Sequence, residues 1–240
     1  MTAKSKYSYE LVTDIHDMDF NGVAKTSSVL RYIQTAAQNQ LTENGLSYDN
    51  LISRGLAFII SRMKLEIYKP IFVYDRLMAT SFPCHSKGFI FPRCYTLRRD
   101  GEIIARASSS WALINTETHS LVRTSGFTLP IETSDPLDMD MMHERFPDGL
   151  KTVGTYTVSY QDLDQNRHLN NTKYADMFSN FLPLDMRRIA SIDISYKSEA
   201  RWKEALTVLR ADAGEKTYIR TVKPDGSINA EAIVTLADIT

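Results

Sequence analysis

Apolar residues in the first half of the chain alternate, then take helical spacing, and then alternate again. Positions 6–13 alternate like a strand, 14–25 form a polar loop, and 26–44 hold apolar residues three and four apart. This spacing predicts a buried helix, followed by a short helix or turn at 46–55. Four strand-like runs follow, at 57–69, 75–85, 89–99 and 102–115. Asp100-Gly101, between the last two, is a hairpin turn signal.

The same order of elements recurs after an irregular segment. Residues 116–150 contain three prolines and an acidic group, which predicts a linker across a surface. A strand at 152–160, a polar loop, a helix at 170–187 and four strands near 189–199, 203–213, 216–223 and 228–238 follow. The chain thus divides into an N-terminal copy (1–115), a linker (116–150) and a C-terminal copy (151–240).

The residues themselves also repeat. D-M-D-F-N at 17–21 matches D-L-D-Q-N at 162–166, an offset of 145, and Y-K-P-I at 68–71 matches Y-K-S-E at 196–199, an offset of 128. A long apolar helix followed by antiparallel strands buries itself only if the sheet curls around the helix. We therefore expect an α+β fold, a tandem double hotdog. Each copy would be a long central helix wrapped by an antiparallel sheet, with the two sheets joined edge to edge.

Composition narrows the range of partners and compartments. Lys and Arg number 28 against 29 Asp and Glu, so the basic excess that phosphate contacts with nucleic acid usually require is missing. The first residues show no secretory or transit leader, and no apolar run approaches the roughly 18 residues of a membrane span. Two cysteines, Cys84 and Cys94, are too few for a disulfide scaffold or a zinc site. These features predict a cytoplasmic protein without a metal or cofactor.

The candidate chemistry gathers in one polar loop that leads directly into the second helix. Its polar residues are Asp162, Asp164, Asn166, His168, Asn170 and Asn171. Asn170 or Asn171 is a good N-cap, so the first N–H groups of the helix would point back at the loop. Such a helix start favours negative charge, including an oxyanion that forms during a reaction.

The two copies differ at the positions that titrate. His168 is matched by Val23, and Glu199 is matched by Ile71, whereas the Asp and Asn positions are shared. Duplication followed by loss of function in one copy would leave this asymmetry. We therefore expect the chemistry in the C-terminal copy alone, while the alternative is a structural Asp/Asn-rich turn with an ordinary surface histidine.

The loop D-L-D-Q-N-R-H-L-N-N-T-K-Y resembles the D-x-N-x-H-x-N-N-x-x-Y signature of plant and bacterial acyl-acyl carrier protein (acyl-ACP) thioesterases. Y-K-S-E-A resembles that family's downstream strand with its acidic residue, and the N-terminal copy resembles the family through its helix and the strand F-I-I-S-R-M-K. The resemblance implies a double-hotdog hydrolase of fatty acid biosynthesis that releases fatty acids from ACP. It places Asp164, Asn166, His168 and Glu199 at the family's functional positions.

One departure from the family bears on the mechanism. Ala200 stands where several plant members carry cysteine, and the only thiols lie in the N-terminal copy. A water mechanism is therefore expected, in which Glu199, alone or with His168, takes a proton from the attacking water. Asn166 would orient the water or the carbonyl, Asp164 would hold a neighbour in place, and the helix start at Asn170 and Asn171 would receive the oxyanion.

Several alternatives stay open at this level. An acyl-CoA thioesterase of the same fold, a hotdog dehydratase and a non-catalytic acyl-binding protein fit the same pattern. The sequence leaves open the acyl chain length and the choice between His168 and Glu199 as the base. A basic group could receive an acidic carrier protein or complement the end of the helix; it comprises Arg187, Arg188, Lys197, Arg201 and Lys203. We expect an acyl-chain pocket in the N-terminal copy, acyl-ACP as partner and a homodimer.

Overall fold

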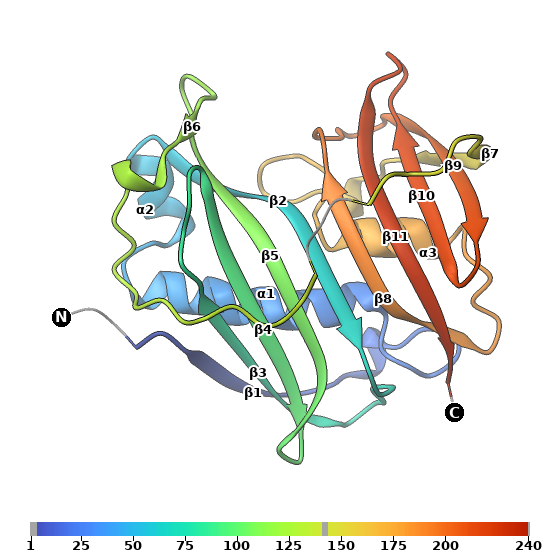
Figure 1. Ribbon diagram of the computed structural model, residues 1–240, viewed down its shortest axis with the longest axis horizontal. Coiled ribbons are helices and arrows are strands. Elements are labelled where there is room, and N and C mark those ends of the chain that lie inside the picture. Colours follow the sequence, from blue (N-terminus) through green and yellow to red (C-terminus); the bar gives the residue numbers. More distant parts are fainter. Residues whose placement is uncertain (1–3, 141–143, 240) are drawn as a thin grey trace.

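One antiparallel sheet organises the protein, and the computed structural model describes residues 4–140 and 144–239 of it. The strand order is β1-β3-β4-β5-β2-β8-β11-β10-β9-β7, with β6 paired to β5. Read outward from the β2–β8 junction, the two halves have the same order. The α+β class and the edge-to-edge joining of two repeated halves are therefore confirmed (Figure 1).

The first half contains β1 (Tyr7–Val12), α1 (Thr26–Glu43), α2 (Tyr48–Ser53), β2 (Leu56–Ile67), β3 (Arg76–Pro83), β4 (Ile90–Arg99), β5 (Glu102–Asn115) and β6 (Leu121–Val122). The second contains β7 (Lys151–Thr157), α3 (Lys173–Ser179), β8 (Arg187–Tyr196), β9 (Ala205–Ala213), β10 (Lys216–Val222) and β11 (Ile228–Asp238). Single 3₁₀ turns occur at Ile15–Asp17, Thr124–Gly126 and Tyr160–Asp162. Strand positions agree with the predicted ranges to within three residues, except for β6, which lies in the segment predicted as a linker.

Both α1 and α3 lie on the same face of the sheet, behind it in Figure 1. The first turn of α1 is buried on all sides, and from Tyr32 onward its buried residues fall on one helical face. Val29, Leu30 and Ala36 are completely inaccessible. They join Met177 and Phe178 of α3 in a core that runs through both halves. One continuous core therefore underlies the whole sheet.

The predicted long helix over 170–187 is wrong. α3 has seven residues against 18 in α1, so the second half has no long central helix. Its apolar residues do continue to Phe181 and Leu182, but Pro183 follows. Because proline disfavours helical geometry in the residue before it and removes a backbone donor, the chain leaves the helix there. Arg187 and Arg188 consequently begin β8 and do not lie at a helix end.

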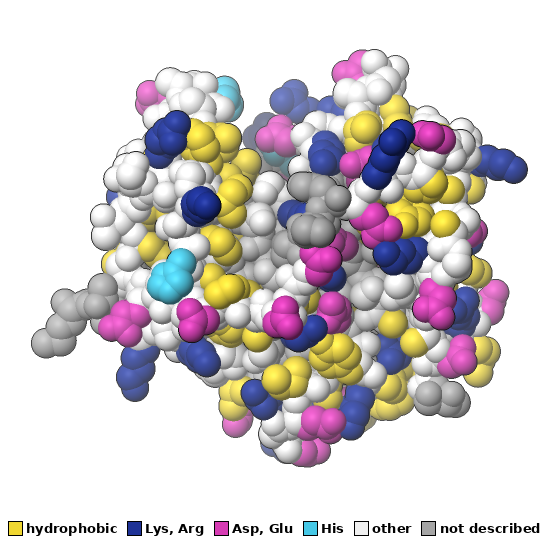
Figure 2. Space-filling model, viewed as in Figure 1, with side chains coloured by type: hydrophobic (Ala, Val, Ile, Leu, Met, Phe, Trp, Pro, Cys, Tyr) yellow, Lys and Arg dark blue, Asp and Glu magenta, His cyan; other side chains and the backbone are white. Residues whose placement is uncertain are grey.

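The linker runs over the face of the sheet opposite the helices (Figure 1). Ser134 N donates to Pro83 O at 2.9 Å, and Lys64 Nζ donates to Asp140 O at 2.7 Å, so the linker is tied to β3 and β2. On the face shown in Figure 2, acidic and basic side chains are interspersed. That face therefore offers no single-sign surface for a polyanion.

Candidate functional site

The polar loop between β7 and α3 is shaped by two buried or half-buried carboxylates. Asp164 Oδ1 accepts the N–H groups of Asn166 at 2.8 Å and of His168 at 3.3 Å. The Asp162 carboxylate accepts hydrogen bonds from Ser159 N, Ser159 Oγ and Tyr156 OH. These bonds fix the backbone that carries Asn166 and His168.

Asp162 is ionised because its hydrogen bonds favour the charged form. Burial alone would raise the pKa of this carboxyl, but the donors of Ser159 and Tyr156 outweigh burial and hold the pKa below its usual range. The same effect holds the pKa of Asp17, its counterpart in the first half, below the usual range. The loop scaffold is therefore built the same way in both halves.

The structure brings His168 and Glu199 together across the segment that follows β8. Leu169 N donates to Ala200 O at 2.8 Å, which lays the loop beside that segment. His168 Nε2 then lies 3.1 Å from Glu199 Oε2. The exposed fractions of the two side chains are 27% and 60%, so the pair is open to solvent and to a substrate. This geometry suits an acid–base pair that shares a proton with a bound water.

Asn166 is held by a residue that sequence analysis did not identify. Tyr48, on α2 of the first half, donates its hydroxyl to Asn166 Oδ1 at 2.7 Å. The Asn166 Nδ2 group then remains the donor of the amide. No sequence pattern pointed to Tyr48, because it lies 118 residues from its partner. The site is thus assembled from both halves of the chain.

Asn170 and Asn171 precede the helix and do not cap it in the predicted way. α3 begins at Lys173, and Asn170 Oδ1 accepts from Thr172 N at 2.9 Å. Asn170 N is bonded to Asp162 O. Among residues 4–140 and 144–239, the structure shows no acceptor for Asn171 N–H. That N–H group is therefore available to a bound ligand.

The structure shifts the predicted match between the halves by one residue. Ala24 N donates to Ile71 O at 2.8 Å, as Leu169 N does to Ala200 O. Ile71 therefore corresponds to Ala200, and the counterpart of Glu199 is Pro70. The sequence match was wrong by one residue because both halves contain the letters Y-K. The positions that make corresponding backbone hydrogen bonds are offset by one residue from those letters. Neither Pro70 nor Val23 titrates, so the acid–base pair exists only in the second half.

An apolar cluster beneath α2 lies next to the site. It is formed by the end of α1, by α2 and by β2, β4 and β5, with Leu41, Leu46, Leu51, Phe58, Phe91, Leu113, Trp111 and Phe127 among its members. A cavity of only about 20 Å³ lies within it, beside Leu41, Phe58 and Trp111. That volume holds about one water molecule. An acyl chain would have to displace side chains to enter here.

Exposed cationic and aromatic residues follow the site along the chain. Arg201 forms a backbone bridge to His168, and Trp202 and Lys203 come next. Trp202 is 54% exposed, and its ring lies edge-on to that of Tyr160. This group, defined as the 201–203 rim, is open to a macromolecular partner.

The two cysteines are buried in the first half. Cys84 follows β3 and Cys94 lies in β4, packed with Phe82. A hydrogen bond with Cys94, together with burial, raises the pKa of the Cys84 thiol. Within the described ranges, no three His, Cys, Asp or Glu side chains are arranged to hold a metal ion. None of the described helices is long and apolar enough to cross a bilayer.

Family models match both halves. The acyl-ACP thioesterase N-terminal domain matches residues 4–126, and the acyl-ACP thioesterase C-terminal domain matches residues 147–236.

Among curated relatives, a chloroplastic palmitoyl-acyl carrier protein thioesterase of Cuphea hookeriana is 23% identical over 85% of this chain and 52% of its own length. The chloroplastic oleoyl-acyl carrier protein thioesterase 2 of Arabidopsis thaliana is 24% identical over 81% of this chain and 60% of its own. The chain thus spans about half the length of the curated relatives it matches.

Two solved structures share the fold over nearly the whole chain. An acyl-ACP thioesterase from Bacteroides thetaiotaomicron has a TM-score of 0.89 at 18% identity, covering 97% of this chain and 98% of that one. The 12:0-ACP thioesterase from Umbellularia californica has a TM-score of 0.80 at 18% identity, covering 97% of each chain.

Proposed function

This chain belongs to the acyl-ACP thioesterase family, and we propose that it hydrolyses fatty acyl-ACP thioesters to a free fatty acid and ACP. The observation that carries the proposal is the His168–Glu199 pair, 3.1 Å apart at an open face. We also propose that the fold is a tandem double hotdog in which the second helix is short. The mirrored strand order on either side of the β2–β8 junction supports this.

Water is the proposed nucleophile. The His168–Glu199 pair takes a proton from a water molecule while the water oxygen attacks the thioester carbonyl carbon. The carbonyl electrons move onto oxygen, and the resulting oxyanion is received by Asn166 Nδ2 and Asn171 N–H. When the intermediate collapses, the carbon–sulfur bond breaks and the carrier's thiolate takes up the proton. Asp164 acts as a positioning residue, because it holds the N–H groups of Asn166 and His168.

The acyl chain is proposed to enter the apolar cluster beneath α2. Tyr48 stands on α2 beside the loop, and Leu51 of the same helix belongs to the cluster. The acyl chain of a thioester bound at Asn166 would therefore extend directly onto apolar side chains. Because the cavity there is small, chain entry is expected to require movement of α2.

The 201–203 rim is proposed to contact the acidic surface of the carrier protein. Assays of the purified protein should show faster turnover of acyl-ACP than of the matching acyl-CoA and acyl-pantetheine. In the variant Arg201→Glu, Lys203→Glu, KM for acyl-ACP should rise about tenfold or more, since charge reversal at a rim slows association. Turnover of acyl-pantetheine, which lacks the carrier, should stay unchanged. Equal or better turnover of acyl-CoA would assign the protein to the CoA thioesterases.

Tyr48→Phe is expected to lower kcat by about two- to tenfold, because one hydrogen bond that orients Asn166 is lost. KM and thermal stability should change little. Tyr74→Phe, at a tyrosine that is 72% exposed, is the matched control. In an Asn166→Ala background, Tyr48→Phe should have no further effect. Additive losses in the double variant would show that Tyr48 acts elsewhere.

We propose a homodimer, because β1 and β7 end the sheet and have no further neighbouring strand among residues 4–140 and 144–239. Light scattering is expected to give twice the chain mass of 27.3 kDa at micromolar concentration. A constant single-chain mass across that range would contradict the proposal.

A further inference from the structure

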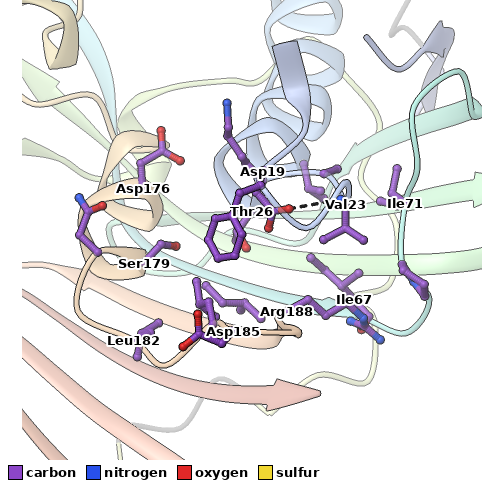
Figure 3. Close-up of a pocket in the computed structure, with 18 residues that line it drawn as sticks. Asp19, Val23, Thr26, Ile67, Ile71, Asp176, Ser179, Leu182, Asp185 and Arg188 are labelled. Atoms are coloured by element: carbon purple, nitrogen blue, oxygen red, sulfur yellow. Dashed lines mark hydrogen bonds between the residues drawn. The ribbon is translucent and has the colours of Figure 1, made fainter. Parts of the chain in front are cut away.

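A cavity of about 480 Å³ lies beside the first-half loop that corresponds to the loop of His168 (Figure 3). Both halves of the chain contribute to its walls. Its walls come from the loop after β1, the start of α1, the end of α3 with the segment that follows, and the adjoining ends of β2 and β8. This volume falls within the range of sites that hold small molecules. The cavity therefore has room for a ligand, in contrast to the space beneath α2.

The short second helix explains why the cavity exists. α3 ends at Ser179, and Ser179, Leu182 and Leu184 form one wall. Val23 and Ile71 of the opposite wall are 2% exposed each, and Pro70 lies beside them in the lining. Val23 and Pro70 stand where His168 and Glu199 stand in the second half, so the place of that pair is apolar here. A ligand in this cavity would therefore meet no counterpart of the His168–Glu199 pair.

Arg188 brings to the cavity wall a positive charge that has no ion-pair partner among the described residues. Its guanidinium donates to two backbone carbonyls, Ile67 O at 2.9 Å and Tyr68 O at 3.1 Å. Among the residues that the structure describes, Arg188 has no ion pair and its buried Nε has no acceptor. Backbone carbonyls do not neutralise a charge, so Arg188 is left without a counter-ion. Figure 3 shows it between Asp185 and Ile67 at the base of the cavity.

The other charges around the cavity are largely engaged. Asp176 forms an ion pair with Lys173 at 3.1 Å, and Asp19 Oδ1 accepts the N–H groups of Asn21 and Val23. Asp185 is exposed and adds one negative charge at the rim. Lys25 also lines the cavity and adds one positive charge, and its Nζ donates to His16 O. With Lys173 counted, the charges around the cavity balance, so the attraction for an anion is local to the Arg188 guanidinium and favours a ligand with one negative charge over one with two.

The start of α1 adds a second attraction for an anion. Lys25 and Thr26 line the cavity at the first turn of this 18-residue helix. That turn holds no acidic residue, and no side chain of the described part caps it. The positive end of the helix dipole therefore faces the cavity without a capping side chain.

We propose that this cavity is a second, non-hydrolytic binding site for an unbranched aliphatic carboxylate, that is, a free fatty acid. Its carboxylate binds at Arg188 and the start of α1. Its chain lies against Ile67, Leu182 and Leu184. Binding in this cavity requires no catalysis by His168 and Glu199. The binding site can therefore be tested independently of the proposed hydrolase function.

The test is calorimetric titration with decanoate below its micelle concentration. Ser179→Trp, which fills the cavity, should abolish one class of binding sites while acyl-ACP hydrolysis stays within about twofold. Arg188→Met should weaken that class by about tenfold or more, since a charge-assisted hydrogen bond is lost, and Arg188→Lys should weaken it less. His168→Ala should leave it unchanged.

Two controls decide the outcome. Leu184→Trp fills the same cavity from the loop and should reproduce the effect of Ser179→Trp. If one of the two variants is poorly folded, the other gives the result. Decanol, which has the same chain without the charge, should bind at least about tenfold more weakly than decanoate. Unchanged decanoate binding in both folded tryptophan variants would overturn the site, and equal binding of decanol would overturn its preference for a carboxylate.

Discussion

His168→Ala, Asn166→Ala and Glu199→Ala are each expected to lower kcat by about 10²- to 10⁴-fold while the protein stays folded. His168 and Glu199 form a close pair whose positions are held by Val23 and Pro70 in the first half, and Asn166 offers its amide group beside them. All three are half-buried or exposed, so truncation costs little packing. Single-turnover kinetics on acyl-ACP, together with thermal unfolding of each variant, measure the two effects separately.

Asn21→Ala is the matched control in the first half. Asn21 Nδ2 donates to Leu184 O at 2.9 Å, so its loss should cost about 1 to 3 kcal/mol of unfolding free energy. Turnover by the folded fraction should not change, because Val23 and Pro70 stand where the pair would be. If Asn21→Ala lost as much turnover as Asn166→Ala at unchanged stability, confinement of the chemistry to the second half would be refuted.

The two thiols provide a further check on the nucleophile. The double variant Cys84→Ala, Cys94→Ala should keep most of its kcat, because both side chains are buried in the first half and water attacks the thioester. A folded but inactive double variant would favour a cysteine nucleophile instead.

Local signals were sufficient to predict ten strands of this sheet, and they missed the two-residue strand β6. Asp100 and Gly101 have φ angles of 52° and 82°, the positive values that a tight hairpin turn requires, and the sequence marks them directly. β5 and β11 have the predicted bounds because alternation and turn residues lie within a few positions of each other. The palindromic strand order then followed from the repeat.

The length of the second helix was not predictable from periodicity alone. Phe181 and Leu182 continue the apolar spacing of α3, yet they pack after the helix has ended. Phe181 instead lies against Gly154 of β7, where an added Cβ would come within 2.6 Å of its ring. Tertiary packing thus replaced a helical turn, and the open cavity beside Leu182 is the consequence.

The candidate site was predicted in part. The repeat and the family resemblance identified His168 and Glu199, whose 3.1 Å contact depends on a loop and a strand end that the repeat places side by side. The contact of Tyr48 with Asn166 is a hydrogen bond between distant segments. The match of Ile71 with Ala200 likewise depends on hydrogen bonds between segments far apart in the sequence. No periodicity records such bonds, so only the three-dimensional structure reveals them.

Arg62→Met is expected to lower the free energy of unfolding by about 3 to 5 kcal/mol, because it breaks a buried ion pair at the junction of the halves. Arg62 of β2 donates to both carboxylate oxygens of Asp193 of β8, with Nε–Oδ1 at 2.8 Å and Nη2–Oδ2 at 2.7 Å. The side chains are 8% and 14% exposed. The variant would leave the Asp193 carboxylate desolvated without its guanidinium, at the strand pair that joins the two sheets.

The double variant Arg62→Met, Asp193→Leu should recover most of that loss, because no charge is then buried and apolar side chains fill the space. Urea denaturation of the single and double variants measures the coupling between the two positions. Lys69→Met is the exposed control, since the Lys69–Glu102 pair is 47% and 59% exposed and should contribute less than about 1 kcal/mol. If the double variant were as unstable as the sum of the single changes, the ion pair would not be what holds the β2–β8 junction, and packing of the shared core beneath it would carry that role.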